Sequence, residues 1–256
     1  MTDLAALAAV AERAARAAGV LLRGRPQHID HKGAVDLVTE VDLASERVIR
    51  DILGRDAPGI AIQGEEGGGA VAGTRWAVDP IDGTTNFVHG YPFYCVSIGL
   101  IDADTPVVGV IYDPVRDRLL RAWRGGGTTV NGAPVRVSTE RDLDAALSVT
   151  GFPYDRRTRA AFYLERVERA LAATQGVRRS GSAAMDLLTI ATGAAELFWE
   201  YHLKPWDTAA GAVLVREAGG TVTRLDGSAW TPDAPDLLAT NGHVHEAAVR
   251  LLGADV

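Results

Sequence analysis

Two aspartates three residues apart mark the segment Trp76 to Phe87, which reads WAVDPIDGTTNF. The apolar residues before Asp79 predict a strand, and Pro80 cannot donate to a strand ladder, so we expect the chain to turn there. On such a turn Asp79 and Asp82 can face one site, and the GT pair that follows can present free backbone N–H groups at a helix start. Metal and phosphate would then lie side by side. An isolated DxxD pair is also commonly a turn or a helix cap.

A pair of glutamates, Glu65 and Glu66, directly follows a predicted strand at Ile60 to Ile62. Active sites of parallel sheets gather at this end of the strands, so one of the two carboxylates can ligate a cation. A glutamate pair ahead of a glycine run is equally typical of a solvated loop. We expect the glycines that follow, Gly67 to Gly69, to form a flexible connection rather than a phosphate cradle.

Three further aspartates lie in short motifs. Asp207 stands at the start of a predicted helix that reads WDTAAGAVLVREAGG and ends at its last two glycines. Asp36 and Asp42 flank Thr39 in the segment DLVTEVD. Taken alone, each of these aspartates is explained as a helix cap or a surface carboxylate.

Hydrophobic periodicity predicts the elements that position these residues. An amphipathic helix opens the chain from Leu4 to Leu21, and a second helix, capped by Asp42, runs to Leu53 and ends at Gly54 and Pro58. Strands are expected at 60–62, 75–78, 95–101, 107–112 and 135–137. After residue 151, helices near 159–172, 183–192 and 208–218 alternate with strands near 197, 221 and 238. This mixture suggests stacked sheets and helices.

The chain shows no internal repeat, low-complexity tract or proline-rich linker. We therefore expect one continuous unit, in which residues 1–150 form an N-terminal lobe with most of the acidic motifs and residues 151–256 form a C-terminal lobe. The boundary between these lobes is soft.

Composition narrows the classes of function. Hydrophobic residues make up 47% of the chain and charged residues 23%, the balance of an ordinary globular protein. The formal net charge of -7 argues against a nucleic-acid partner. Cys95 is the only cysteine, so an internal disulfide and a thiolate zinc site are excluded, and we expect the cytoplasm. The N-terminus has no basic and apolar signal pattern, and no stretch is long enough to predict a membrane span.

Several common catalytic motifs are missing from the sequence. Neither GxxxxGK[ST] nor GxSxG occurs, which argues against a phosphate loop and a serine hydrolase. The six histidines are scattered, and His243, His245 and Glu246 do not complete HExxH, so we interpret them as surface or packing residues.

Taken together and in order, the acidic motifs resemble the inositol monophosphatase family of metal-dependent, lithium-sensitive phosphatases, over nearly the whole chain. The resemblance rests on DLVTEVD, GEE, WAVDPIDGTTNF and WDTAAGAVLVREAGG, and on the substrate-side tract RRSGSAAMDL at 178–187. It implies an α+β fold with a layered α-β-α-β-α arrangement of the sugar-phosphatase type.

The resemblance also implies a magnesium site with two or three ions. Glu65, Asp79 and the carbonyl of Ile81 would hold the first Mg²⁺, and Asp79, Asp82 and Asp207 would hold the second. Oxygen ligands of this kind suit a hard cation. If the four carboxylates converge, a divalent cation must relieve them, because two carboxylates about 4 Å apart repel by roughly 4 kcal/mol at an effective dielectric near 20.

Catalytic and substrate residues follow from the same resemblance. Glu65 and Thr84 would orient the attacking water, with Asp42 accepting a hydrogen bond from the Thr84 hydroxyl. The substrate would contact a wider set, namely Asp82, Gly83, Thr84, Gly181, Ser182, Ala183 and Glu200. The roles of Glu66 and Lys32 are left open.

The expected reaction is the hydrolysis of inositol monophosphate or a related small polyol or sugar phosphate. His202 stands where the family commonly has a small Gly, which keeps histidinol phosphate, fructose 1,6-bisphosphate and nucleotide phosphates as alternatives. A non-catalytic regulatory protein of the same fold is a further alternative. By analogy with the family we also expect a homodimer.

Overall fold

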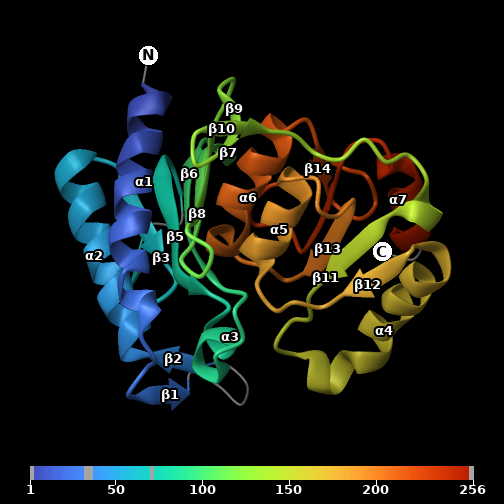
Figure 1. Ribbon diagram of the computed structural model, residues 1–256, viewed down its shortest axis with the longest axis horizontal. Coiled ribbons are helices and arrows are strands. Elements are labelled where there is room, and N and C mark those ends of the chain that lie inside the picture. Colours follow the sequence, from blue (N-terminus) through green and yellow to red (C-terminus); the bar gives the residue numbers. More distant parts are fainter. Residues whose placement is uncertain (1–2, 32–36, 70–71, 254–256) are drawn as a thin grey trace.

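Helices and sheets alternate in five layers in the computed structural model, which describes residues 3–31, 37–69 and 72–253 (Figure 1). Lys32 and Asp36 lie outside the described residues. The layers are, in order, α1 (Leu4–Gly19) with α2 (Glu40–Asp56), an eight-stranded sheet, α5 (Ala183–Ala191) with α6 (Pro205–Glu217), a five-stranded sheet, and α4 (Arg156–Ala173) with α7 (His245–Leu252). The predicted α+β fold with a layered α-β-α-β-α arrangement is confirmed.

The first helix packs closely on the large sheet because its buried face is made of alanines. Its first turn is capped by the carboxylate of Asp3, which accepts from the backbone N of Ala6 at 3.0 Å. At its other end, a Cβ on Gly19 would lie 2.4 Å from the ring of Tyr112. The helix ends at Gly19 and a 3₁₀ turn, Leu21–Arg23, follows, so the expected extension to Leu21 was wrong.

Helix α2 begins two residues earlier than predicted. Thr39 is its cap, and Asp42 occupies the third helical position, where its Oδ2 accepts from the backbone N of Thr39 at 2.8 Å. The two residues form a capping box in which Asp42 plays the role usually given to Glu. Gly54 does not end the helix, which continues to Asp56.

The eight-stranded sheet has the order β10-β9-β8-β7-β6-β5-β3-β4 and is antiparallel except for the pair β3·β5. Its strands are β3 (Ala61–Gly64), β4 (Gly68–Gly69), β5 (Arg75–Asp82), β6 (Cys95–Asp102), β7 (Thr105–Asp113), β8 (Arg118–Trp123), β9 (Gly127–Val130) and β10 (Ala133–Val135). Strands β4, β8 and β9 were not predicted, and the expected flexible connection at Gly67 to Gly69 was wrong, because Gly68 and Gly69 pair with β3. The expected turn at Pro80 was also wrong, because β5 runs on to Asp82 through a register shift against β6 that accommodates the proline.

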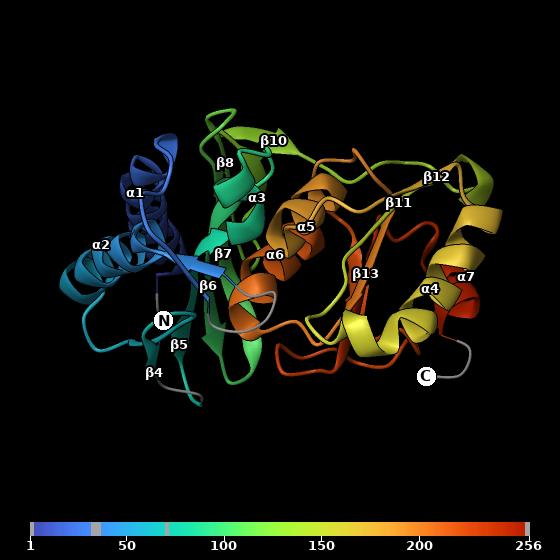
Figure 2. The same cartoon turned by 90° about the horizontal axis from the view of Figure 1, so that it is seen from below.

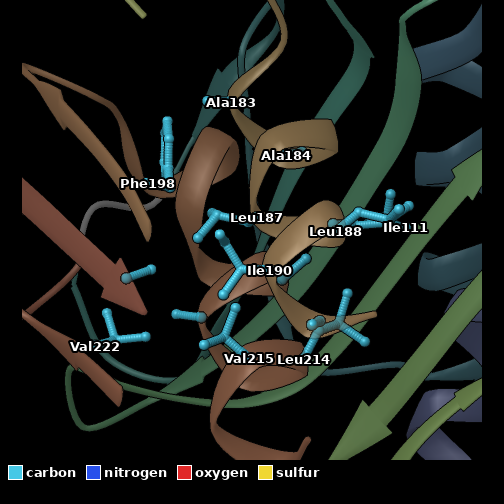
Figure 3. Close-up of a cluster of buried hydrophobic side chains, with 14 of the residues drawn as sticks. Ile111, Ala183, Ala184, Leu187, Leu188, Ile190, Phe198, Leu214, Val215 and Val222 are labelled. Carbon is cyan, nitrogen blue, oxygen red and sulfur yellow. The ribbon is translucent and has the colours of Figure 1, made fainter. Parts of the chain in front are cut away.

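Helices α5 and α6 fill the space between the two sheets, and Figure 3 shows their apolar side chains interdigitating in the largest part of the core. Two glycines of the large sheet let α6 approach its backbone. A Cβ on Gly99 would lie 2.7 Å from the Cβ of Ala209, and a Cβ on Gly109 would lie 2.2 Å from the carbonyl oxygen of Ala210. The start of α6 is thereby seated directly on strands β6 and β7.

The second sheet has the order β12-β11-β13-β15-β14, and α4 and α7 cover its outer face (Figure 2). Its strands are β11 (Leu147–Thr150), β12 (Gly176–Arg178), β13 (Leu197–Tyr201), β14 (Thr221–Thr223) and β15 (Asp236–Thr240). Strand β11 is parallel to both β12 and β13, whereas β15 is antiparallel to β13 and β14. Three smaller elements complete the described chain: the antiparallel pair of β1 (Ile29–His31) with β2 (Leu37–Thr39), the short helix α3 (Thr84–His89), and a 3₁₀ turn at Leu143–Ala145.

Among residues 3–31, 37–69 and 72–253, every helix is too short or too polar to cross a bilayer.

Candidate active site

One large pocket, of about 710 Å³, lies where the two sheets and the central helices meet. Eleven of the twelve residues that the sequence assigned to the site line it: Glu65, Asp79, Ile81, Asp82, Gly83, Thr84, Gly181, Ser182, Ala183, Glu200 and Asp207. The twelfth, Asp42, is fully buried behind the wall. Segments that are up to about 140 residues apart in the sequence therefore meet at one cavity.

The parallel pair β3·β5 explains why the first acidic motifs meet. Gly64 pairs with Val78 at the carboxyl ends of the two strands, so the next residues, Glu65 and Asp79, leave the same edge of the sheet. The backbone N of Glu65 donates to the carbonyl of Val78 at 3.1 Å and keeps the two segments in contact. This is the end of a parallel pair where ligand sites form.

Asp79 is a buried carboxylate of the pocket wall, surrounded by other acidic side chains. It is 2% exposed, and its Oδ1 accepts from the backbone N of Ile81 at 2.9 Å. Burial raises the pKa of Asp79 well above its usual value, and the charges of Glu65, Asp82 and Asp207 raise this pKa further. A hydrogen bond to the Glu65 side chain acts in the same direction. Negative charge is thus concentrated around Asp79 with no cationic side chain among the causes of its shift.

Asp82 joins the large sheet to the start of α5. Its Oδ2 accepts from the Ser182 hydroxyl at 2.6 Å and from the backbone N of Ala184 at 2.6 Å. Burial raises the pKa of Asp82 to about 6, although the hydrogen bonds from Ser182 and Ala184 favour its charged form. One wall of the pocket is therefore fixed to the other through this carboxylate.

Asp207 lies at the third position of α6 rather than at its cap. The helix begins at Pro205, and the Oδ2 of Asp207 accepts from the backbone N of Lys204 at 2.7 Å. The expected helix start at Thr208 was therefore too late by one turn. Burial raises the pKa of Asp207 well above its usual value, and the charge of Asp82 adds to this effect.

The predicted contact between Thr84 and Asp42 is present. The Thr84 hydroxyl lies 3.0 Å from Oδ1 of Asp42 and 2.9 Å from the carbonyl oxygen of Ile81, so it can donate to either acceptor. Oδ2 of Asp42 accepts from both the backbone and the hydroxyl of Thr39. The buried carboxylate thereby fixes the rotamer of Thr84 from behind the pocket.

The oxygen atoms that the acidic residues present to the pocket fit a hard divalent cation. Every available ligand is an oxygen, and Asp79, Asp82 and Asp207 each engage one carboxylate oxygen with a backbone N–H group. Among the described residues, no three acidic, histidine or cysteine side chains already stand in ligand geometry around one point. Mg²⁺ usually takes only one or two carboxylates and completes its shell with water and phosphate, so it does not require such a cluster.

Glu200, on β13, lies in the opposite part of the pocket. It is buried, and burial raises its pKa to about 8, while the nearby Arg179 and Arg156 lower this pKa and Asp82 raises it. Gly151 makes room for the side chain, because a Cβ there would lie 2.1 Å from Oε2 of Glu200. The substrate side thus combines a buried acid with two arginines, both of which line the pocket.

Several residues that shape the pocket were missed at the level of the sequence. Arg179 lies inside the tract RRSGSAAMDL, but no pattern marked it out from its neighbours, and Arg156 has no motif at all. Asp186, on α5, is 1% exposed, and burial followed by the charges of Glu200 and Asp82 raises its pKa well above its usual value. Glu46 binds the loop after Glu65, and its position one turn after Asp42 on α2 was an available signal.

His202 is exposed, in agreement with the prediction that the histidines are surface or packing residues, and it also lines the pocket. Its φ is 57°, in the left-handed region that favours glycine. His245 conforms to the prediction, since its ring nitrogens bond the hydroxyls of Thr223 and Thr240.

Comparison with known proteins adds an independent finding. A model described as the inositol monophosphatase family matches residues 3–254. An inositol-1-monophosphatase of Synechocystis sp. is 47% identical to this chain over 99% of it and 91% of the relative. The Nus factor SuhB of Escherichia coli is 42% identical over 85% of each chain. The solved structure of an inositol monophosphatase from Anabaena sp. superposes with a TM-score of 0.90 at 42% identity, covering 98% of this chain and 97% of its own.

Proposed function

This chain belongs to the inositol monophosphatase family, and we propose that it hydrolyses inositol monophosphate or a related small polyol phosphate with the help of Mg²⁺. As a member it is a phosphoric monoester hydrolase. One observation supports the metal-dependent mechanism above all others: Glu65, Asp79, Asp82 and Asp207 line one pocket, and the charges of the other three raise the pKa of Asp79.

A buried group of like charges is unfavourable unless a cation neutralises it. We assign Glu65, Asp79 and the Ile81 carbonyl to one Mg²⁺ and Asp79, Asp82 and Asp207 to a second, with two or three ions in the working site. When bound, these ions supply positive charge to the phosphate oxygens, acidify a water molecule and stabilise the leaving alkoxide. The carboxylates of the chain hold that charge in place, and their oxygen-only character favours hard cations over soft ones.

The attacking water is oriented by Glu65 and Thr84. The Thr84 hydroxyl directs its proton to Asp42 or to the Ile81 carbonyl, at 3.0 and 2.9 Å, so its lone pairs are left to accept from water. A Glu65 carboxylate beside it accepts a second hydrogen bond from the same water. Together the two side chains fix the direction of attack, which contributes to the rate through orientation.

The alcohol part of the substrate would lie toward Glu200. At neutral pH a carboxyl with a pKa near 8 is mostly protonated, so it can donate to one hydroxyl of a polyol and accept from another. Arg179 and Arg156 lie close enough to act on the same group electrostatically. Gly181, Ser182 and Ala183 complete this side of the pocket.

Other phosphate esters handled by the same metal core are the competing candidates. They are histidinol phosphate, fructose 1,6-bisphosphate and nucleotide phosphates, and His202 at the pocket wall is the residue that sets this chain apart from the commoner family form. A non-catalytic regulatory role is the less favoured candidate, because three carboxylates with unfavourable burial, Asp79, Asp82 and Asp207, are retained here.

The proposal extends to the oligomeric state, the compartment and the partners of the enzyme. We infer a homodimer in the cytoplasm, inhibited by lithium, with no nucleic-acid or membrane partner. The single cysteine supports a reducing compartment, and the net charge of -7 disfavours nucleic acid. Light scattering of the purified chain tests the dimer.

The test of function is phosphate release from a panel of esters, each measured with Mg²⁺ and with a chelator. We expect release that requires Mg²⁺ and is fastest with a polyol monophosphate. An aryl phosphate serves as a featureless reference for the metal core alone. Release that persists in the chelator would contradict the metal mechanism, and a clear preference for a bisphosphate or nucleotide would replace the polyol assignment.

A further inference from the structure

Helix α2 presents three charged side chains, Asp42, Glu46 and Arg50, at intervals of four residues, so they lie on one face. Asp42 contacts Thr84, as described above. Glu46 and Arg50 contact the loop that follows β3 and carries Glu65. The same helix face therefore contacts Thr84 directly and holds the residues that follow Glu65, the other residue to which we assign the orientation of water.

Glu46 is a buried carboxylate with every strong contact directed at this loop or at Arg50. It is 3% exposed. Its Oε2 accepts from the backbone N of Glu66 at 2.8 Å, and its Oε1 accepts from the backbone N of Gly67 at 2.8 Å. Nε of Arg50 donates to Oε1 at 2.7 Å and neutralises the charge. Hydrogen bonds to an ionised acceptor are roughly twice as strong as neutral ones.

The chain leaves room for this carboxylate by placing glycines around Glu65. A Cβ on Gly64 would lie 2.5 Å from Oε1 of Glu46, and a Cβ on Gly67 would lie 2.6 Å from the same atom. On the far side of the loop, Nη2 of Arg50 donates to the carbonyl of Gly68 at 2.7 Å. The backbone on both sides of Glu65 is thus held, by the Val78 carbonyl before it and by Glu46 after it.

We propose that Glu46 is a positioning residue for metal binding and hydrolysis, which acts by fixing the backbone of residues 66 and 67 so that the Glu65 carboxylate stays beside Asp79. This inference rests on the proposed function. It gives α2 a specific task, because one rigid helix then sets the position of Glu65 relative to Thr84. Partners that orient a metal ligand commonly change metal affinity or activity by about 10- to 100-fold when they are removed.

Glu196 offers a matched control. It is also a buried glutamate, 8% exposed, whose Oε2 accepts from a backbone N–H, that of Leu147 at 2.6 Å. It lies directly before β13 of the second sheet and does not line the pocket. The substitution Glu196→Gln removes the negative charge of a buried glutamate that bonds to the backbone, without touching the loop of Glu65.

The experiment compares Glu46→Gln with Glu196→Gln. In Glu46→Gln, the new side-chain amide would turn its NH₂ group toward one of the two backbone N–H donors and lose that bond. We expect Glu46→Gln to speed hydrogen exchange of the Glu66 and Gly67 amides in the metal-free protein by about tenfold, the equivalent of one lost hydrogen bond. Calorimetric Mg²⁺ affinity and kcat/KM should both fall about 10- to 100-fold. Glu196→Gln should change none of these quantities.

A double mutant separates positioning from general destabilisation. If Glu46 acts through Glu65, Glu46→Gln should add little to the loss of Mg²⁺ affinity in a Glu65→Gln background. Equal losses in both backgrounds, or unchanged exchange and affinity in the single mutant, would overturn the inference. Should Glu46→Gln not fold, Arg50→Gln removes the contacts to Glu46 and Gly68 more mildly and is judged by the same measurements. A wild-type protein that releases no phosphate would refute the proposed function, whereas the exchange and affinity data would still decide the role of Glu46.

Discussion

The substitution Asp79→Asn tests the metal assignment most directly. Asn keeps the oxygen that accepts from the backbone N of Ile81, so the local backbone bond survives while the negative charge is lost. In our assignment Asp79 contacts both ions, and losing a bridging ligand should lower kcat by on the order of a thousandfold or more, about 4 kcal/mol of lost stabilisation. Phosphate release at saturating Mg²⁺ measures this loss, and calorimetry measures the accompanying fall in Mg²⁺ affinity.

The same substitution should stabilise the protein when no metal is present. Two carboxylates about 4 Å apart repel by roughly 4 kcal/mol at a dielectric near 20, and protonation already relieves much of this. We expect a gain of about 1 kcal/mol, which corresponds to a rise of about 2–4 °C in Tm for a chain of this size.

The pH dependence of this gain follows from the raised pKa of Asp79. Between the unfolded and the folded pKa the native state binds more protons than the unfolded state, so the stability of the wild type falls as pH rises through that window. The metal-free wild type should therefore lose stability on going from acid toward neutral pH, and Asp79→Asn should lose less. Near-native turnover with unchanged Mg²⁺ dependence, or a metal-free Tm below that of the wild type, would refute the reasoning.

Three further predictions concern the substrate side and the ions. Glu200→Ala should lower kcat/KM for the polyol phosphate by roughly tenfold to a hundredfold, because the polyol contacts this carboxyl. Hydrolysis of an aryl phosphate, which does not contact it, should be unchanged. Equal losses on both esters would show that Glu200 supports the metal-binding carboxylates or the fold instead. Millimolar lithium should inhibit phosphate release, since Li⁺ is close to Mg²⁺ in size but brings less charge, and indifference to lithium would count against the inositol phosphatase assignment. His202→Gly should leave the free energy of unfolding, measured by urea denaturation, unchanged or raise it by up to about 1 kcal/mol. The reason is that glycine adopts the left-handed φ of 57° without the strain of a side chain. A loss greater than about 1 kcal/mol would contradict this.

Local patterns predicted the site better than they predicted the limits of the elements. The carboxylates that we assign to the metal ions stand in short motifs at fixed spacing, and the meeting of Glu65 with Asp79 depends mainly on the β3·β5 pair, whose two strands were predicted. Strand β8 was missed because RLLRAW offers only a short apolar run between charged residues, and its strand character comes from pairing with β7 and β9. The continuation of β5 through Pro80 depends on a bulge against β6, which no local pattern announces.

Residues that act across elements were the hardest to foresee. Glu46 carries no motif, and nothing singled Asp186 out within the tract RRSGSAAMDL; their environments arise only when α2 meets the Glu65 loop and α5 meets β13. The assignment of Asp42 as a helix cap was wrong for a related reason, since Thr39 and Asp42 are both good capping residues and their reciprocal bonds decide between them. The lobe boundary near residue 150 stays a prediction.

The direct packing of α6 on the backbone of strands β6 and β7 affects how substitutions in the core act on this site. Where a helix rests on side chains, substitutions in the core can be absorbed by repacking, and the helix drifts by a few tenths of an ångström. Between α6 and strands β6 and β7, no side chain of Gly99 or Gly109 is available to adjust, because the glycines bring the backbones into direct contact. Amino-acid substitutions elsewhere in the core should therefore have little effect on the position of Asp207 relative to Asp79. Such variation can accumulate in the surrounding layers without moving the two carboxylates with respect to each other.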